Sequence, residues 1–180
     1  MLYFVRHGQT DANVNKVYAG QNDVELNKNG IEQAKQTAKE LKDINFDICF
    51  CSPLKRAAQT CQEIVKFHPE LKIVCDERLK ERDYGNLVGL PIGSVKFNRW
   101  KAGEDEEVNK KYNIENVLHL HDRVSNFYDD ILQKYSGKNI LIVAHSGIGR
   151  ITIGYFKGMP KNLDFSGIRI GNAEVLKFEN

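Results

Sequence analysis

Two uninterrupted apolar runs constrain the fold more than any other feature of the chain. Residues 2–5 (Leu-Tyr-Phe-Val) and 139–144 (Asn-Ile-Leu-Ile-Val-Ala) are short and rich in β-branched or aromatic side chains. They lack the polar alternation of a strand with one face in water, and so predict strands that are buried on both faces. Because both faces of such a sheet must be covered, helices are expected on each side of it.

The rest of the pattern supplies further strands. Residues 46–51 and 71–75 predict two of them, and an alternating run at 173–178 predicts a final edge strand. Strands that alternate with helices predict an α/β fold of three layers (α/β/α), with a mainly parallel sheet and an antiparallel edge strand. We expect one domain over residues 1–180, with a polar, mixed insertion flap at about residues 87–116.

Helix signals lie between these strands. Asn27 is placed to cap a helix with apolar residues at helical spacing, and Gly137 is placed to end a long amphipathic one. Ser52 and Pro53 predict the N-cap and the first residue of a further helix, because the proline needs no hydrogen-bond acceptor there. Residues 148–156 predict the last helix.

Composition excludes several classes of protein. Twenty-six Lys and Arg against twenty-four Asp and Glu give a net charge of +2, without the basic excess of a nucleic-acid binder. No run approaches the roughly 18 apolar residues of a membrane span, and no leader-like segment precedes the first strand. The four cysteines lie in apolar segments and are predicted to be buried thiols. We expect a cytoplasmic protein with no nucleic-acid or membrane partner.

Several residues with catalytic potential follow the predicted strands. His7 and His145 each stand at the end of a strand, Glu81 lies in a loop after a strand, and all meet at one rim of a parallel sheet. Arg6 precedes His7, and Arg56 lies in the first turn of a predicted helix, where the helix dipole disfavours a cation. Two guanidinium groups beside a helix N-terminus suit the oxygens of a phosphoryl group.

A neutral histidine in such a pocket can attack phosphorus and form a phosphohistidine. His7 is the candidate nucleophile, since Arg6 and Arg56 would disfavour its protonated form. Gly8 would allow the backbone to approach closely. Glu81 could protonate the leaving oxygen and then activate water. Arginines and His145 could stabilise the charge of phosphoryl transfer, so we expect no metal or other cofactor.

Four motifs, in order, resemble the histidine phosphatase (phosphoglycerate mutase-like) superfamily. They are Arg-His-Gly at residues 6–8, Ser-Pro-Leu-x-Arg-Ala-x-x-Thr at 52–60, Glu-Arg-x-Tyr-Gly at 81–85 and Ala-His-Ser-Gly at 144–147. The resemblance spans essentially the whole chain. It implies a three-layer α/β/α core, a phosphorylated histidine, a glutamate proton donor and an arginine-rich phosphate pocket. The implied catalytic residues are His7, Glu81, Arg6, Arg56 and His145, and the implied substrate-binding residues are Gly8, Asn13, Gly20, Gln21, Tyr84 and Ser146.

Departures from the mutase branch favour hydrolysis. The mutase pattern at the second histidine is Ala-His-Gly-Asn, whereas this chain has Ser146 and Gly147 after His145. The flap also lacks the adjacent arginine pair that binds a second acidic group in the mutases. We therefore expect a metal-independent phosphomonoesterase of the phosphatase branch, acting on small phosphorylated metabolites. Two alternatives stay open: a phosphoglycerate mutase, and a non-catalytic module that binds phosphate or a phosphoprotein. Two copies could pair through the final edge strand.

Other interpretations of single residues also stay open. His7, His145 and Glu81 could instead form a zinc site, although nearby arginines would repel the ion. Trp100 and Arg99, with the neighbouring residues Lys96, Phe97 and Lys101, could form a substrate-selecting lid or merely a solvated helix with one apolar face.

Overall fold

The computed structural model describes residues 1–179 and contains a five-stranded mixed sheet. The strand order is β3-β2-β4-β1-β5, and only β5, at one edge, runs antiparallel to its neighbour. The three-layer fold and its antiparallel edge strand are thereby confirmed. The single domain expected over residues 1–180 includes Asn180, which lies outside the described residues. The strands are β1 (Leu2–Arg6), β2 (Ile48–Cys51), β3 (Ile73–Cys75), β4 (Ile140–Ala144) and β5 (Val175–Phe178).

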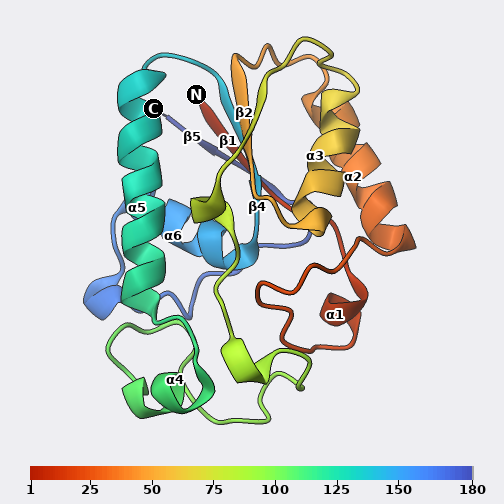
Figure 1. Ribbon diagram of the computed structural model, residues 1–180. Coiled ribbons are helices and arrows are strands. Elements are labelled where there is room, and N and C mark those ends of the chain that lie inside the picture. The colour runs from red at the N-terminus through yellow and green to blue at the C-terminus, as the bar shows by residue number, and fades with distance from the viewer. Residues whose placement is uncertain (180) are drawn as a thin grey trace.

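Helices cover both faces of this sheet (Figure 1). Helices α2 (Lys28–Leu41) and α3 (Lys55–Val65) pack together on one face, and α5 (Val117–Lys134) and α6 (Ser146–Lys157) lie on the other. The short helices α1 (Asp11–Val14) and α4 (Glu106–Tyr112) lie beyond the carboxyl ends of the parallel strands. Among residues 1–179, none of the helices combines the length and the apolar character that crossing a membrane requires.

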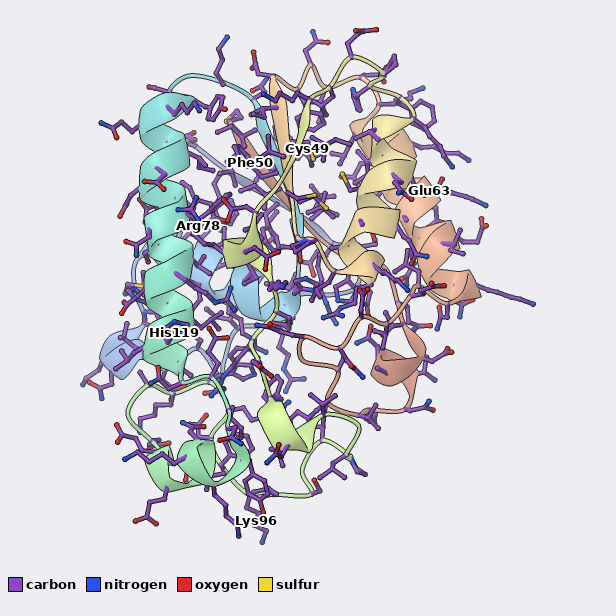
Figure 2. All side chains as sticks on the ribbon, in the orientation of Figure 1. Cys49, Phe50, Glu63, Arg78, Lys96 and His119 are labelled. Carbon is purple, nitrogen blue, oxygen red and sulfur yellow. The ribbon has the colours of Figure 1, made fainter. Side chains whose placement is uncertain are left out.

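The sheet separates two apolar cores. Phe4 and Phe50 pack with Phe127 of α5 on one face, whereas Cys49 packs with Cys61 of α3 on the other. Figure 2 shows Cys49 and Phe50 on opposite sides of β2, as alternation along a strand requires. Three of the cysteines are buried as predicted, but the prediction is wrong for Cys75, which is exposed on the edge strand β3.

Local capping signals explain the start of one helix and fail at another. The side chain of Asn27 accepts a hydrogen bond from the Gly30 amide at 2.9 Å, so the predicted cap of α2 is confirmed. The predicted cap at Ser52 is wrong, because α3 begins at Lys55 and its N-cap residue makes no side-chain bond. The Ser52 hydroxyl lies instead 2.7 Å from Nε2 of His145, a partner distant in the sequence.

The expected flap is ordered around one buried arginine. Arg82 is 1% exposed, and its guanidinium donates to the carbonyls of Arg99 and Glu115. It also lies over the rings of Tyr84 and Trp100. These contacts tie the middle and the C-terminal end of the flap to the segment that follows Leu79, although the residues of the flap are largely polar. The flap also contains α4, which was not predicted.

Candidate active site

Strand pairing brings the two histidines together. Strands β1 and β4 are parallel neighbours, with Arg6 opposite Ala144, so the next residue of each strand emerges at the same edge of the sheet. The His7 amide donates to the Ala144 carbonyl at 3.0 Å. The ring centroids of His7 and His145 lie 5.1 Å apart, with the rings tilted by 59°. Placement at adjacent strand ends is what the sequence pattern predicted.

The His7 ring is held as a neutral imidazole with one defined tautomer. Its Nδ1 lies 2.7 Å from the Gly8 carbonyl oxygen, which can only accept, so Nδ1 carries the proton. Burial holds the pKa of His7 well below its ordinary value, and the positive charges of Arg56 and Arg6 lower it further. Nε2 therefore keeps a free electron pair, which is the requirement for a nucleophile.

Two arginines stand beside this ring with donors to spare. Arg56, in the first turn of α3, is 1% exposed and donates to the carbonyls of Gly20 and Asn22, each at 2.8 Å. Arg6 donates to the carbonyl of Ile170 at 2.6 Å, and its buried Nε has no partner. Burial lowers the pKa of both guanidinium groups, which nevertheless stay charged at neutral pH. Their unused N–H groups suit a bound oxyanion.

Glu81 is fixed by backbone amides. Its carboxylate accepts hydrogen bonds from the Gly147 amide, at 3.1 and 3.2 Å to the two oxygens, and from the Arg82 amide at 2.8 Å. A Cβ atom on Gly147 would lie 2.1 Å from Oε1 of Glu81, so a larger residue there would have to displace the carboxylate from its present position. The Glu81 carbonyl is held in turn by the side chains of Gln21, at 3.1 Å, and Arg123, at 3.2 Å.

His145 is buried and bonded on one side only. Its Nε2 lies 2.7 Å from the Ser52 hydroxyl, whereas its Nδ1 is buried without a partner. The Leu54 amide donates to the same hydroxyl at 3.4 Å, which leaves the Ser52 proton free to bond Nε2. Burial, followed by the charge of Arg56, holds the pKa of His145 well below its ordinary value. With Nε2 accepting, the ring proton belongs on Nδ1, ready for another acceptor.

These groups surround a cavity of about 180 Å³. Most of the predicted site residues line it: Arg6, His7, Asn13, Gly20, Arg56, Glu81, Tyr84 and Ser146. His145 lies next to the His7 ring and Gln21 contacts Glu81, and neither of them lines the cavity. Gly8 allows a close backbone approach, as expected: a Cβ atom there would lie 2.3 Å from the Gly30 carbonyl of α2. Its amide donates to the Thr60 hydroxyl at 3.0 Å.

Several residues in the cavity wall escaped the sequence prediction. Tyr18 and Arg150 line it, and Arg99 and Trp100 reach it from the flap, as the lid interpretation of that segment requires. The absence of an adjacent arginine pair therefore does not leave the cavity without further cations. Arg150 had one usable signal: it is a charged residue in α6, which follows the second histidine directly. Within residues 1–179, no three His, Cys, Asp or Glu side chains are grouped to hold a metal ion.

Comparisons with known proteins agree with this geometry. The family model of the histidine phosphatase superfamily (branch 1) matches residues 2–179. The uncharacterized phosphatase PhoE of Bacillus subtilis is 38% identical over 147 residues, which cover 78% of this chain and 69% of that protein. A 2,3-bisphosphoglycerate-dependent phosphoglycerate mutase of Rhizobium meliloti is 36% identical over 155 residues, covering 80% and 73% of the two chains.

A solved structure gives the same result for the fold. The phosphoserine phosphatase of Entamoeba histolytica, crystallised with 3-phosphoglyceric acid, superposes with a TM-score of 0.80 at 26% identity. The match covers 97% of this chain and 87% of that one. The family match extends over nearly the whole chain, and both kinds of relative carry out phosphoryl chemistry. The chain therefore belongs to the histidine phosphatase superfamily, as a phosphatase or phosphoglycerate mutase-like enzyme.

Proposed function

We propose that this protein is a metal-independent phosphomonoesterase that hydrolyses small phosphorylated metabolites through a phosphohistidine at His7. The observation that carries the proposal is the His7 tautomer: Nδ1 is fixed on the Gly8 carbonyl, and Nε2 stays unprotonated beside two cations. Arg6 and Arg56 hold the phosphoryl oxygens, and His145 offers a further donor. A neutral imidazole in a cationic, buried pocket suits attack on a dianionic ester.

The reaction proceeds in two displacements. In the first, Nε2 of His7 forms a bond to phosphorus as the ester oxygen leaves, and Glu81 in its acid form gives that oxygen a proton. In the second, Glu81 takes a proton from water, and the water oxygen displaces Nε2 to release inorganic phosphate. Arg6 and Arg56 stabilise the charge on the transferring group in both steps, a role worth on the order of 10³-fold or more in rate.

The test is phosphate release from a panel of sugar phosphates, phosphoglycerates, nucleotides and an aryl phosphate. We expect release that persists in a metal chelator and falls by about 10³-fold or more in His7→Ala. His119→Gln is the matched control, because His119 is an exposed histidine on α5 (Figure 2). Rapid quenching should trap an acid-labile phosphate on wild type and none on His7→Ala. Loss of activity in chelator, restored by zinc, would contradict the mechanism.

A phosphoglycerate mutase is the second candidate, favoured by the mutase relatives and by the extra arginines around the cavity. It is distinguished by supplying 3-phosphoglycerate with a 2,3-bisphosphoglycerate primer. Isomerisation faster than phosphate release would make the protein a mutase. Phosphate binding with neither reaction would favour a non-catalytic binding module, in which the ordered Glu81 carboxylate would have no role.

A further inference from the structure

A second cavity, of about 510 Å³, adjoins the first. The two share a wall that includes Arg6, Ser146 and Trp100, so a molecule held by its phosphate in the first cavity would extend into the second. Some wall residues belong to the second cavity alone, and these come from the flap and from the segment before β5. They are Phe97, Asn98, Ser166, Arg169 and Ile170.

All the charged side chains that line this second cavity are positive. Arg99 reaches it from the flap, Arg150 from α6 and Arg169 from the segment before β5, and no Asp or Glu lines it. Within residues 1–179, the ion pairs of the protein involve none of these three side chains. Cations gathered without counter-charge repel one another, so their convergence favours an anionic ligand.

Arg150 gives an independent indication of such a ligand. It is 9% exposed, one of its Nη atoms donates to the Phe165 carbonyl, and its guanidinium lies 4.5 Å from the centre of the Trp100 ring. Its buried Nε has no partner. Burial, with added repulsion from Arg99 and Arg6, lowers the pKa of Arg150 to about 10, so it remains charged at neutral pH. A buried charged donor without an acceptor is costly unless a ligand supplies one.

Backbone contacts hold the walls of the second cavity in place. The Phe165 amide donates to the Trp100 carbonyl at 2.8 Å, and the Ala102 amide donates to the Leu163 carbonyl at 3.2 Å. The flap is thus bound to the segment that carries Arg169. The carbonyl of Arg99 accepts a hydrogen bond from buried Arg82. The arginines therefore stand on fixed backbone, which suits a binding site more than a solvated rim.

We propose that the second cavity binds a second anionic group of the substrate, a carboxylate or another phosphate, through Arg99, Arg150 and Arg169. The inference rests on the proposed function, because it places the ester phosphate on Arg6 and Arg56. The preferred substrates are then phosphomonoesters that carry another acid a few atoms away. Three arginines from separate segments would do what an adjacent pair in the flap could do.

The binding test uses His7→Ala protein, which retains the arginines but lacks the nucleophile. Calorimetry compares three monoesters on one alkyl chain, whose far end is a hydroxyl, a carboxylate or a second phosphate, over chain lengths of two to five carbons. At the best length, the carboxylate or the bisphosphate should bind about tenfold tighter than the alcohol, as charge-assisted hydrogen bonds to arginine predict. Comparison of the two acids shows which group the cavity takes.

Variants then locate the source of this preference. Arg169→Gln and Arg99→Gln should each reduce the ratio of the acid's affinity to the alcohol's severalfold, whereas Arg169→Lys should keep most of it. Lys96→Gln is the matched control: it removes a positive charge from the same flap, but Lys96 is exposed and points away from the sheet (Figure 2). Equal affinity of acid and alcohol at every length would overturn the proposal. So would equal effects of Arg169→Gln and Lys96→Gln.

Hydrolysis by the wild type separates this inference from the proposed function. Tighter binding of the acids without phosphate release would support the second anion site and contradict the proposed phosphatase activity. Phosphate release that depends on His7 but shows no preference for the acids would support the phosphatase activity and contradict the second anion site. If both hold, kcat/KM for the acid relative to the alcohol should fall in Arg169→Gln, mainly through KM.

Discussion

The hydroxyl of Ser52 lies next to the ring of His145 in space and can determine where that ring carries its proton. Its oxygen accepts the Leu54 amide, so its proton is available to Nε2 of His145, 2.7 Å away. When Ser52 donates this bond, the ring proton of His145 is left on Nδ1. Nδ1 is buried and otherwise unpartnered, and the proposed mechanism uses it as a donor to a phosphoryl oxygen beside His7. In that mechanism Ser52 is a positioning residue.

Ser52→Ala should lower kcat by about tenfold to 10²-fold, because His145 then loses the contact that fixes its donor. The measurement is steady-state phosphate release as a function of pH. Thr152→Val is the matched control: it removes another buried hydroxyl, 2.7 Å from the Tyr128 hydroxyl and away from the cavity. The control should lose stability and keep kcat. Equal losses of kcat in both variants would contradict the role of Ser52.

At the scale of single elements, local sequence signals predicted the strands and helices well where the cause was local. The apolar run of β4 is buried throughout, and Asn27 caps α2 because its partner lies three residues ahead. The same reasoning failed at Ser52, whose partner lies 93 residues away. Helix α4 was missed because it buries none of its residues and so has no apolar stripe to find.

Helix α5 is joined to the segment that carries Glu81 through a nearly buried ion pair. Arg123, on α5, bonds Glu115 at 2.7 and 3.0 Å, and also donates to the carbonyls of Arg78 and Glu81. The side chains of Arg123 and Glu115 are 14% and 7% exposed. Removal of one partner would leave the other charge with little water around it. The pair thus positions Glu81 through the backbone and contributes to stability.

Arg123→Met should lower the free energy of unfolding by about 3 kcal/mol and reduce kcat, because the Glu81 carbonyl loses a donor. Urea denaturation measures the first effect, and a cycle with Glu115→Gln should show that the double variant loses less than the sum. Asp130→Asn is the control on the same helix, since it breaks the exposed Arg78–Asp130 pair. A loss in the control as large as in Arg123→Met would contradict this account.

At the scale of the whole molecule, the part of the site that sequence could predict follows from topology. His7 and His145 were predicted to meet because parallel strands end at one edge, and Arg56 because its helix follows such a strand. Arg99, Arg150 and Arg169 converge from three separate segments, and no spacing along the chain encodes that meeting. The flap conformation that brings Arg99 in depends on Arg82, whose burial no local pattern predicts.

The two buried histidines also make the stability of the whole protein depend on pH. Burial and Arg56 hold the pKa of both imidazoles well below the ordinary value of about 6.5, so the unfolded chain binds more protons than the folded one as the pH falls past that value. The stability is therefore present above about pH 6.5 and is lost below it. Each histidine should cost about 1.4 kcal/mol at pH 5.5 relative to pH 7.5, by the linkage relation.

Urea denaturation of wild type and His145→Gln at these two pH values tests the prediction. Other titrating groups contribute equally to both proteins, so the difference between their pH-dependent losses isolates His145. The loss should be about 1.4 kcal/mol smaller in His145→Gln, whatever the variant costs at pH 7.5. An unchanged pH dependence in His145→Gln would mean that the folded protein can protonate His145, despite its burial and the charge of Arg56.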